Sequence, residues 1–227
     1  MYRVEDKFSC SEQELFLLQA RLQTVLEPDK NQTSADGYRV TSVYFDDLFD
    51  THLQDTVDGN HLREKYRIRI YNGSYDVIKL EIKSKRDNRV MKRASNITME
   101  QMRELMSGRC IRSENKSMEE PITLFNLAIT NRGLCPKIIV EYDRSAYVYE
   151  PGNVRITLDR DIRVSDQLEA FAKGEKLTYE YERELYQVLE VKYDEFLPGF
   201  ISGMLETGNL NQVSYSKYKI CREIKGA

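Results

Sequence analysis

Basic residues recur at every second position in several short stretches of this sequence, most clearly in YRIRIY at residues 66–71. Alternate residues of a β-strand point to the same face, so Arg67 and Arg69 share one face while Ile68 and Ile70 share the other. If the isoleucines face a core, the arginines are solvated surface charges. If the arginines face inward, they need an anionic partner.

The same alternation occurs in other stretches that are rich in branched and aromatic residues, and their opposite faces are mostly apolar. Residues 61–97 contain 11 basic and 4 acidic side chains, a net charge of +7 in a chain of formal net charge −3. Like charges on neighbouring strands repel, so this pattern requires a bound polyanion or interleaved carboxylates. The charged faces are Arg3, Glu5 and Lys7; Lys65, Arg67 and Arg69; Lys79, Glu81, Lys83 and Lys85; Arg155, Thr157 and Asp159; and Glu190 and Lys192.

These residue types suit phosphate chemistry. Arginine binds phosphate through two parallel hydrogen bonds, and lysine acts as a compact point charge. Carboxylates placed among them can hold a divalent metal through oxygen ligands. The candidate metal ligands are Glu5, Glu81, Asp159 and Glu190.

The elements that would position these residues alternate between strands and helices. Asn-Gly in YNGSY (71–75) tolerates the positive φ of a tight turn, so it predicts a hairpin between two of the strands. Ser11 with Glu14, and Thr98 with Gln101, have the spacing of helix caps. We expect strands at 2–9, 38–47, 61–72, 75–85, 88–97, 136–150, 154–164 and 182–195, and helices at 11–26, 48–60, 98–108, 119–131 and 197–208.

About eight strands with helices between them, and no internal repeat or break in composition, predict a single α+β domain over residues 1–227. The economical architecture is an eight-stranded antiparallel β-barrel with helices packed on the outside, because closure removes exposed strand edges. In such a barrel the charged faces line a wet tunnel, and the apolar faces pack against the outer helices.

The bulk composition narrows the function. The net charge of −3 does not predict nucleic-acid or membrane binding for the whole surface, and no apolar run approaches the ~20 residues needed to span a bilayer. The four cysteines form no CxxC pair, which fits a reducing, cytoplasmic location. With only His52 and His61, catalysis by histidine is not expected.

Eight stretches in this order resemble a known family: RVEDKF, TSVYFDD, YRIRIY, KLEIKSK, EYDRSAY, RITLDRDI, LEVKYDEFLP and SYSKY. They are similar to the VTC domain, the polyphosphate polymerase module of vacuolar transporter chaperone complexes, which has stand-alone prokaryotic relatives. That domain belongs to the triphosphate tunnel metalloenzymes, or CYTH-like superfamily. The resemblance runs from about residue 2 to residue 220.

The resemblance implies an ATP-dependent phosphotransferase with a basic tunnel. The γ-phosphate of ATP, or of another triphosphate, would be transferred to a growing inorganic polyphosphate chain, with Mn²⁺ or Mg²⁺ as the cofactor. Glu190 would be the main metal ligand, with Glu5, Glu81 and Asp159 as helpers. The expected catalytic cations are Lys7, Arg67, Arg69, Lys83, Arg144 and Arg155, and the expected phosphate-binding lysines are Lys65, Lys85, Lys92, Lys192 and Lys217.

One departure concerns the first strand. Tunnel triphosphatases and class IV adenylate cyclases carry Glu-x-Glu-x-Lys there, whereas this chain has Arg3-x-Glu5-x-Lys7. The replacement argues against a two-metal hydrolase and favours the polymerase branch. The regulatory SPX domain and the membrane segments of the eukaryotic complex are also missing, so export of a product would need a membrane partner protein.

Three alternatives stay open. The first is a metal-dependent triphosphatase acting on inorganic or organic triphosphate. The second is a non-catalytic module that binds polyphosphate or another polyanion, although carboxylates such as Glu190 would be a liability in a pure anion sink. The third, an RNA-binding barrel, would require exposed aromatic side chains for stacking, and packing on strands explains most of the 15 tyrosines.

Overall fold

The computed structural model describes residues 3–32, 34, 36–87, 89–112, 119–181, 187–208 and 210–226. Residues 2, 88 and 182–186, which belong to expected strands, lie outside this set. The long strands are β1 (Arg3–Cys10), β3 (Tyr38–Asp46), β4 (Leu62–Tyr71), β5 (Ser74–Arg86), β6 (Arg89–Ile97), β7 (Cys135–Tyr149), β8 (Val154–Ser165) and β10 (Gln187–Tyr193).

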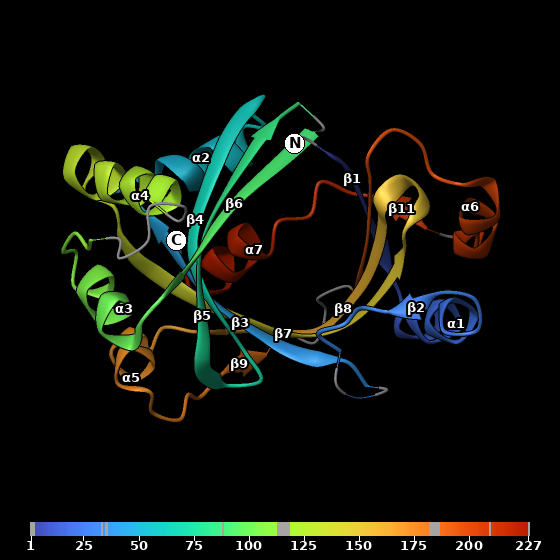
Figure 1. Ribbon diagram of the computed structural model, residues 1–227, viewed down its shortest axis with the longest axis horizontal. Coiled ribbons are helices and arrows are strands. Elements are labelled where there is room, and N and C mark those ends of the chain that lie inside the picture. Colours follow the sequence, from blue (N-terminus) through green and yellow to red (C-terminus); the bar gives the residue numbers. More distant parts are fainter. Residues whose placement is uncertain are drawn as a thin grey trace.

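These eight strands pair antiparallel in the order β7-β3-β4-β5-β6-β1-β10-β8, and β8 pairs back with β7 to close a ring (Figure 1). Among the described residues, the pairing of β1 with β6 places Arg3 opposite Val90 and Val4 opposite Arg89. Three further strands, each of two described residues, pair with strands of the ring: β2 (Glu27–Pro28) with β7, β9 (Glu180–Tyr181) with β8 and β11 (Asn211–Gln212) with β1. The expected α+β fold with a ring of eight antiparallel strands is confirmed.

The described helices are α1 (Glu12–Leu22), α2 (Thr51–Val57), α3 (Met99–Met106), α4 (Glu119–Arg132), α5 (Leu168–Lys173), α6 (Gly199–Leu205) and α7 (Lys217–Ile224). Both expected caps are present, because Ser11 and Glu14 form a reciprocal capping box at α1 and Thr98 and Gln101 form another at α3. Each expected helix is found, while α5 and α7 were not expected from the sequence. None of the helices in the described ranges is both long and apolar enough to cross a membrane.

The YNGSY turn also forms as expected. Asn72 and Gly73 have φ values of 54° and 69°, the left-handed conformation that a two-residue hairpin turn requires. The turn joins β4 to β5 and fixes their register, in which Arg67 lies opposite Glu81 and Lys65 opposite Lys83. The turn residues therefore determine which charged residues of β4 and β5 lie opposite each other.

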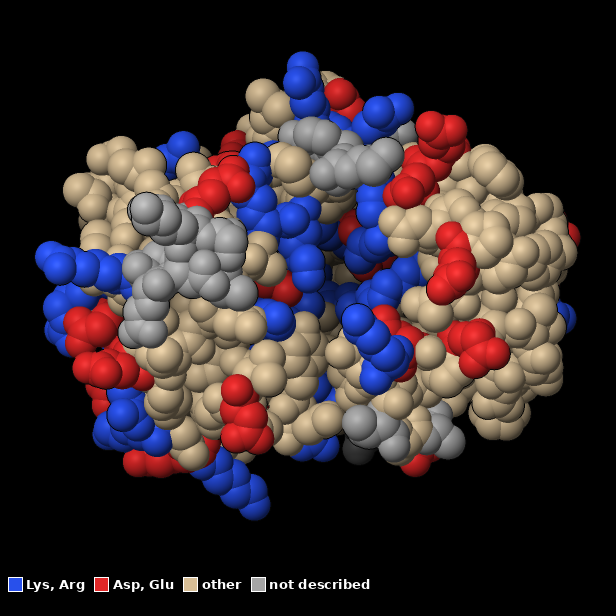
Figure 2. All heavy atoms as spheres, in the orientation of Figure 1, with Lys and Arg blue, Asp and Glu red and all other residues tan. Residues whose placement is uncertain are grey.

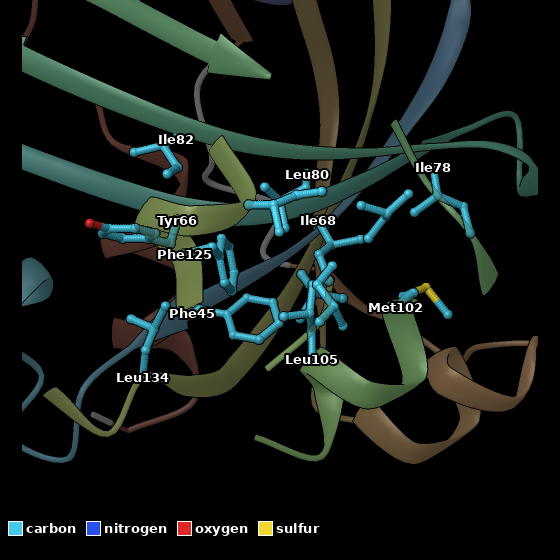
Figure 3. Packing of buried hydrophobic residues seen from close by; sticks show 14 of the residues in the cluster. Phe45, Tyr66, Ile68, Ile78, Leu80, Ile82, Met102, Leu105, Phe125 and Leu134 are labelled. Carbon is cyan, nitrogen blue, oxygen red and sulfur yellow. The ribbon is translucent and has the colours of Figure 1, made fainter. Parts of the chain in front are cut away.

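Two apolar cores lie outside the ring. In the first, Ile68 and Leu80 on the outer face of β4 and β5 pack with Met102 of α3 and Phe125 of α4 (Figure 3). In the second, the outer faces of β8 and β10 pack with α1 and α6. Figure 1 shows these helix groups on opposite sides of the strands. The apolar alternation thus faces outward toward helices, as the sequence indicates.

The C-terminal helix α7 is different, because it packs against the inner face of the ring. Its Tyr218 and Cys221 are buried with Tyr44, Val140 and other apolar side chains that point inward from β3, β7 and β8. Tyr218 stacks on Tyr44 with ring centroids 5.1 Å apart. The sequence-based expectation that the inner face is wholly polar therefore holds for β4 and β5 but not for the side that α7 covers.

Candidate active site

A cavity of about 950 Å³ occupies the part of the ring that α7 leaves open. Twelve basic and four acidic residues line it, together with Tyr38, Tyr44, Tyr71 and Tyr142. Figure 2 shows blue side chains gathered around a hollow in the centre of the molecule. The alternation of the strands explains the concentration of charge, because alternate charged residues of β1, β4 and β10 line this space, together with Lys79 and Lys83 of β5 and Arg155 of β8.

The first cluster surrounds Glu81, which is fully buried. Arg67 donates from Nε to Glu81 Oε2 over 2.8 Å, and Lys92 Nζ donates to Oε1 over 3.0 Å. Arg69 Nη1 lies 3.7 Å from Oε2, while its Nε donates to Ser42. Burial opposes ionisation of Glu81, but the three cations outweigh it and hold its pKa well below the usual range.

The second cluster surrounds Asp159, which is also fully buried. Arg144 binds both of its carboxylate oxygens, with Nε and Nη2 at 2.6 and 2.7 Å, and Lys217 Nζ lies 2.6 Å from Oδ2. Despite burial, these two cations lower the pKa of Asp159 to about 2. Lys217 is the first residue of α7, so this cluster ties the C-terminal helix to β7 and β8.

The third cluster joins two carboxylates that reach the cavity surface, Glu5 and Glu190. Lys83 Nζ donates to both oxygens of Glu5 over 2.8 Å, and Lys192 lies 3.2 Å from the same carboxylate. Lys7 is shared, at 3.5 Å from Glu5 and 3.7 Å from Glu190, and Lys192 also pairs with Glu190. Burial and mutual repulsion favour protonation of the carboxylates, but the lysines dominate and lower the pKa of both.

Burial raises the pKa of a carboxyl group but lowers the pKa of a lysine, and two lysines in this region show the second effect. It lowers the pKa of Lys83 to about 7, helped by nearby Lys7 and opposed by Glu5. Burial and the charges of Lys7 and Lys83 also lower the pKa of Lys65 well below its usual value. A bound anion would favour the charged form of both side chains, so binding of phosphate would raise the pKa of both lysines.

The carboxylates of the ring offer oxygen donors, which hard divalent cations prefer. No group of three or more His, Cys, Asp or Glu side chains in the described part of the chain is arranged to hold a metal ion. Glu5 and Glu190 nevertheless fit a Mg²⁺-like ion, which commonly takes one or two carboxylates and completes its shell with substrate phosphates and water. Glu81 and Asp159 differ from them because they do not line the cavity. They act as counter-charges, Glu81 to Arg67 and Lys92, and Asp159 to Arg144 and Lys217.

The cavity brings together most of the residues singled out in the sequence. All six expected catalytic cations line it, as do Lys65, Lys92, Lys192, Lys217, Glu5 and Glu190. Arg155 lies near the edge, where it binds Asp29 over 2.9 Å and donates to the hydroxyl of Tyr38 over 3.0 Å. Lys85 lies on the same face of β5 but is not among the lining residues.

The sequence reasoning missed several lining residues. Tyr44 and Tyr142 were attributed to packing, yet their hydroxyls accept hydrogen bonds from Arg67 and Arg69, both over 3.2 Å. The signal was present in the alternation, because both tyrosines lie on the inner faces of their strands. Ser216, which accepts a hydrogen bond from Lys65 over 2.7 Å, carried no comparable signal.

Comparisons with known proteins agree with this geometry. The family model described as the VTC domain matches residues 2–224. A putative adenylyl cyclase from Hippeastrum, described as having a dominant triphosphatase activity, superimposes with a TM-score of 0.55 at 15% identity, over 97% of this chain and 95% of its own. A putative adenylate cyclase from Bacillus halodurans gives a TM-score of 0.51 at 12% identity, over 84% and 79%. No curated protein sequence matches significantly. At these identities the two structures show a shared fold.

Proposed function

We propose that this chain, which belongs to the VTC domain family, transfers the γ-phosphate of ATP to a growing inorganic polyphosphate chain inside the ring. The observation that carries the proposal is the cavity itself, which is closed on one side by α7 and lined by twelve basic residues. Such a surface has the charge and the donors to bind a linear chain of phosphates. The family and the cavity together support a function of the triphosphate-tunnel type.

The basic residues would bind and orient the two reactants. Arg67 and Arg144 are held rigidly by Glu81 and Asp159, so their remaining N–H groups can face phosphate oxygens without a large entropic cost. The terminal oxygen of the chain would attack the γ-phosphorus in line, and the bond to the β–γ bridging oxygen would break, releasing ADP. Placing two anions in this geometry is the main task of the site.

No residue need act as a general base in this scheme. The attacking phosphate oxygen is already anionic at neutral pH, and neither His52 nor His61 lines the cavity. Like Lys65, Lys83 can take up a proton when phosphate binds, because its pKa is lowered, to about 7. Its role would be to balance the charge of the reactants rather than to activate the nucleophile.

Glu5 and Glu190 would hold the divalent cation, Mn²⁺ or Mg²⁺. The metal would neutralise the donor phosphates and polarise the bridging oxygen. Because Lys7, Lys83 and Lys192 already contact these carboxylates, the lysines must turn toward substrate when the cation binds. Metal and triphosphate should therefore bind with positive cooperativity.

The deciding experiment incubates the purified protein with ATP and Mn²⁺ or Mg²⁺ and separates the products. ADP together with long polyphosphate is the expected outcome. ADP with free phosphate and no chains would replace the proposal with a triphosphatase. Binding of ATP without any turnover would replace it with a non-catalytic polyanion-binding module.

Glu190→Gln tests the metal assignment. It should raise the metal concentration needed for half-maximal activity by at least about ten-fold, since it removes one of only two carboxylate ligands. Glu169→Gln is the matched control, because Glu169 is an exposed residue of α5 outside the cavity. Metal titration curves that coincide for wild type and Glu190→Gln would exclude Glu190 as a ligand.

A further inference from the structure

Lys79 lines the cavity on the wall next to the β4–β5 hairpin. It lies on β5 directly opposite Arg69 of β4, and its side chain is half-buried. Asp76 and Val77, which line the same wall, are exposed, so this part of the cavity is its rim. Lys79 is on the charged face of β5 but has no place in the clusters described above.

Lys79 differs from the other lining cations in its contacts. Eleven of the twelve basic side chains that line the cavity have a carboxylate, hydroxyl or carbonyl partner. Within the described residues, Lys79 makes neither an ion pair nor a side-chain hydrogen bond. The nearby carboxylate of Asp76 accepts from the hydroxyl of Ser74 instead, over 2.7 Å. Lys79 is therefore a cation on a cavity wall without a protein anion to balance it.

The register of β4 and β5 places cations at three successive levels. Lys79 is opposite Arg69, Glu81 opposite Arg67, and Lys83 opposite Lys65. Successive levels on one face are about 6.7 Å apart along a strand, so Lys79 lies about 13 Å from the level of Lys83. Three phosphates joined by two bridging oxygens are shorter than this separation. A triphosphate bound at the level of Lys65 and Lys83 and at the next level, that of Arg67, would leave Lys79 unoccupied.

We propose that Lys79 is a rim subsite for phosphates beyond the third in a linear chain. The inference rests on the proposed function and adds to it a discrimination by length, in which long inorganic polyphosphate contacts Lys79 and a triphosphate does not. An ammonium group suits this position, because a compact charge on a flexible stem can follow the successive, equivalent phosphates of a chain. The subsite retains the long reactant without holding any single phosphate rigidly.

The test measures the affinity of the full chain for inorganic tripolyphosphate and for long-chain inorganic polyphosphate by titration calorimetry. Lys79→Gln should weaken binding of the long chain by about three- to ten-fold, the range for a half-exposed charged contact, and change tripolyphosphate binding by less than about two-fold. Lys176→Gln is the matched control, since it removes one charge from an exposed position outside the cavity. It should leave both affinities unchanged.

Three results would overturn the assignment. Equal losses for both ligands would place Lys79 in the triphosphate site, and no loss for either would remove it from binding. A loss of long-chain affinity in Lys176→Gln that matched Lys79→Gln would mean that overall charge governs binding. A wild-type protein that bound neither ligand would instead refute the proposed function, and the subsite with it.

Discussion

At the scale of single residues, four carboxylates of the charged strand faces each form ion pairs with at least two basic side chains. Glu5, Glu81, Asp159 and Glu190 thereby offset the mutual repulsion of the cations. Interleaved carboxylates and a bound polyanion appeared as alternatives in the sequence. The structure contains the interleaved carboxylates. Basic residues still outnumber acidic ones around the cavity, and this excess of positive charge can bind a polyanion.

Lys83 should make triphosphate binding dependent on pH. Its pKa in the free protein is lowered to about 7, and a bound anion would raise it, so binding takes up a proton. Affinity for inorganic tripolyphosphate should therefore fall as the pH rises above about 7. Lys83→Arg keeps its charge at every accessible pH and should lose this component, while titration of the ligand itself is common to both proteins. Calorimetry from pH 6 to about 9 measures the difference, and parallel curves would contradict the assignment.

Arg67→Ala should destabilise the protein as well as impair phosphate binding. A cation that lined an open tunnel would support no core, but Arg67 is bound to the fully buried Glu81. Removing it leaves Glu81 with Arg69 and Lys92, and we expect a loss of about 2 kcal/mol in the free energy of unfolding. Urea denaturation of the wild type and the variant measures this loss in the free energy of unfolding.

The double variant Arg67→Ala, Glu81→Gln is the control for that loss. It removes the charge of the carboxylate that has lost its closest partner, so it should be more stable than Arg67→Ala alone. A single variant with unchanged stability, or a double variant that is less stable still, would show that the pair is not coupled in this way.

At the scale of elements, the strands carry the cations and the connections set their positions. The hairpin turn at Asn72 and Gly73 fixes the β4–β5 register, and α7 delivers Ser216 and Lys217 to the cavity. Helix α7 is itself held by charged contacts, because Arg222 donates to both oxygens of Asp50 over 2.9 and 2.8 Å. The cavity wall thus depends on segments from distant parts of the sequence.

Gly37, immediately before β3, should tolerate no side chain. Its φ is +93°, and a Cβ atom there would lie 2.0 Å from the carbonyl oxygen of Arg144, a residue of the cavity wall. Gly37→Ala should cost at least about 3 kcal/mol, because displacement of β7 backbone adds to the conformational penalty. Gly59→Ala is the matched control, since Gly59 also has positive φ (+71°) but open space around it, and it should cost only about 1 kcal/mol. Equal losses in urea denaturation would refute the close approach.

At the scale of the whole molecule, charge is distributed unevenly. The chain has a formal net charge of −3, yet twelve basic and four acidic residues line one cavity. An interior field of this sign attracts polyanions, while the net negative charge of the molecule discourages non-specific binding to them. Binding should therefore be confined to ligands that can enter the ring.

Affinity for inorganic tripolyphosphate should consequently fall with ionic strength. Raising sodium chloride from about 50 to about 500 mM should weaken binding by at least ten-fold, because screening reduces the attraction between the cavity and a multiply charged ligand. The melting temperature of the free protein, followed in parallel, shows whether salt acts on the fold instead. An affinity that did not change with salt would contradict binding through the cationic wall.

The sequence by itself determined the positions of the long strands and which charges share a face of each strand. Alternation has a period of two residues, and caps and turns act over three or four, so YRIRIY, the Asn-Gly turn and the Ser11 and Thr98 caps could all be interpreted locally. Strand positions and the main expected cations followed from the same short-range patterns and from the order of the family motifs.

Only the tertiary structure decided which charged residues form ion pairs and which part of the ring interior is filled by apolar side chains. Lys217 reaches Asp159 across 58 positions, and Lys83 reaches Glu5 across 78, by a ring closure that no local pattern encodes. The insertion of α7 buries Tyr218 and Cys221 inside the ring, although no helix was expected at this position. Burial and ion pairing depend on which surfaces come together, and that is settled when distant strands close around the same space.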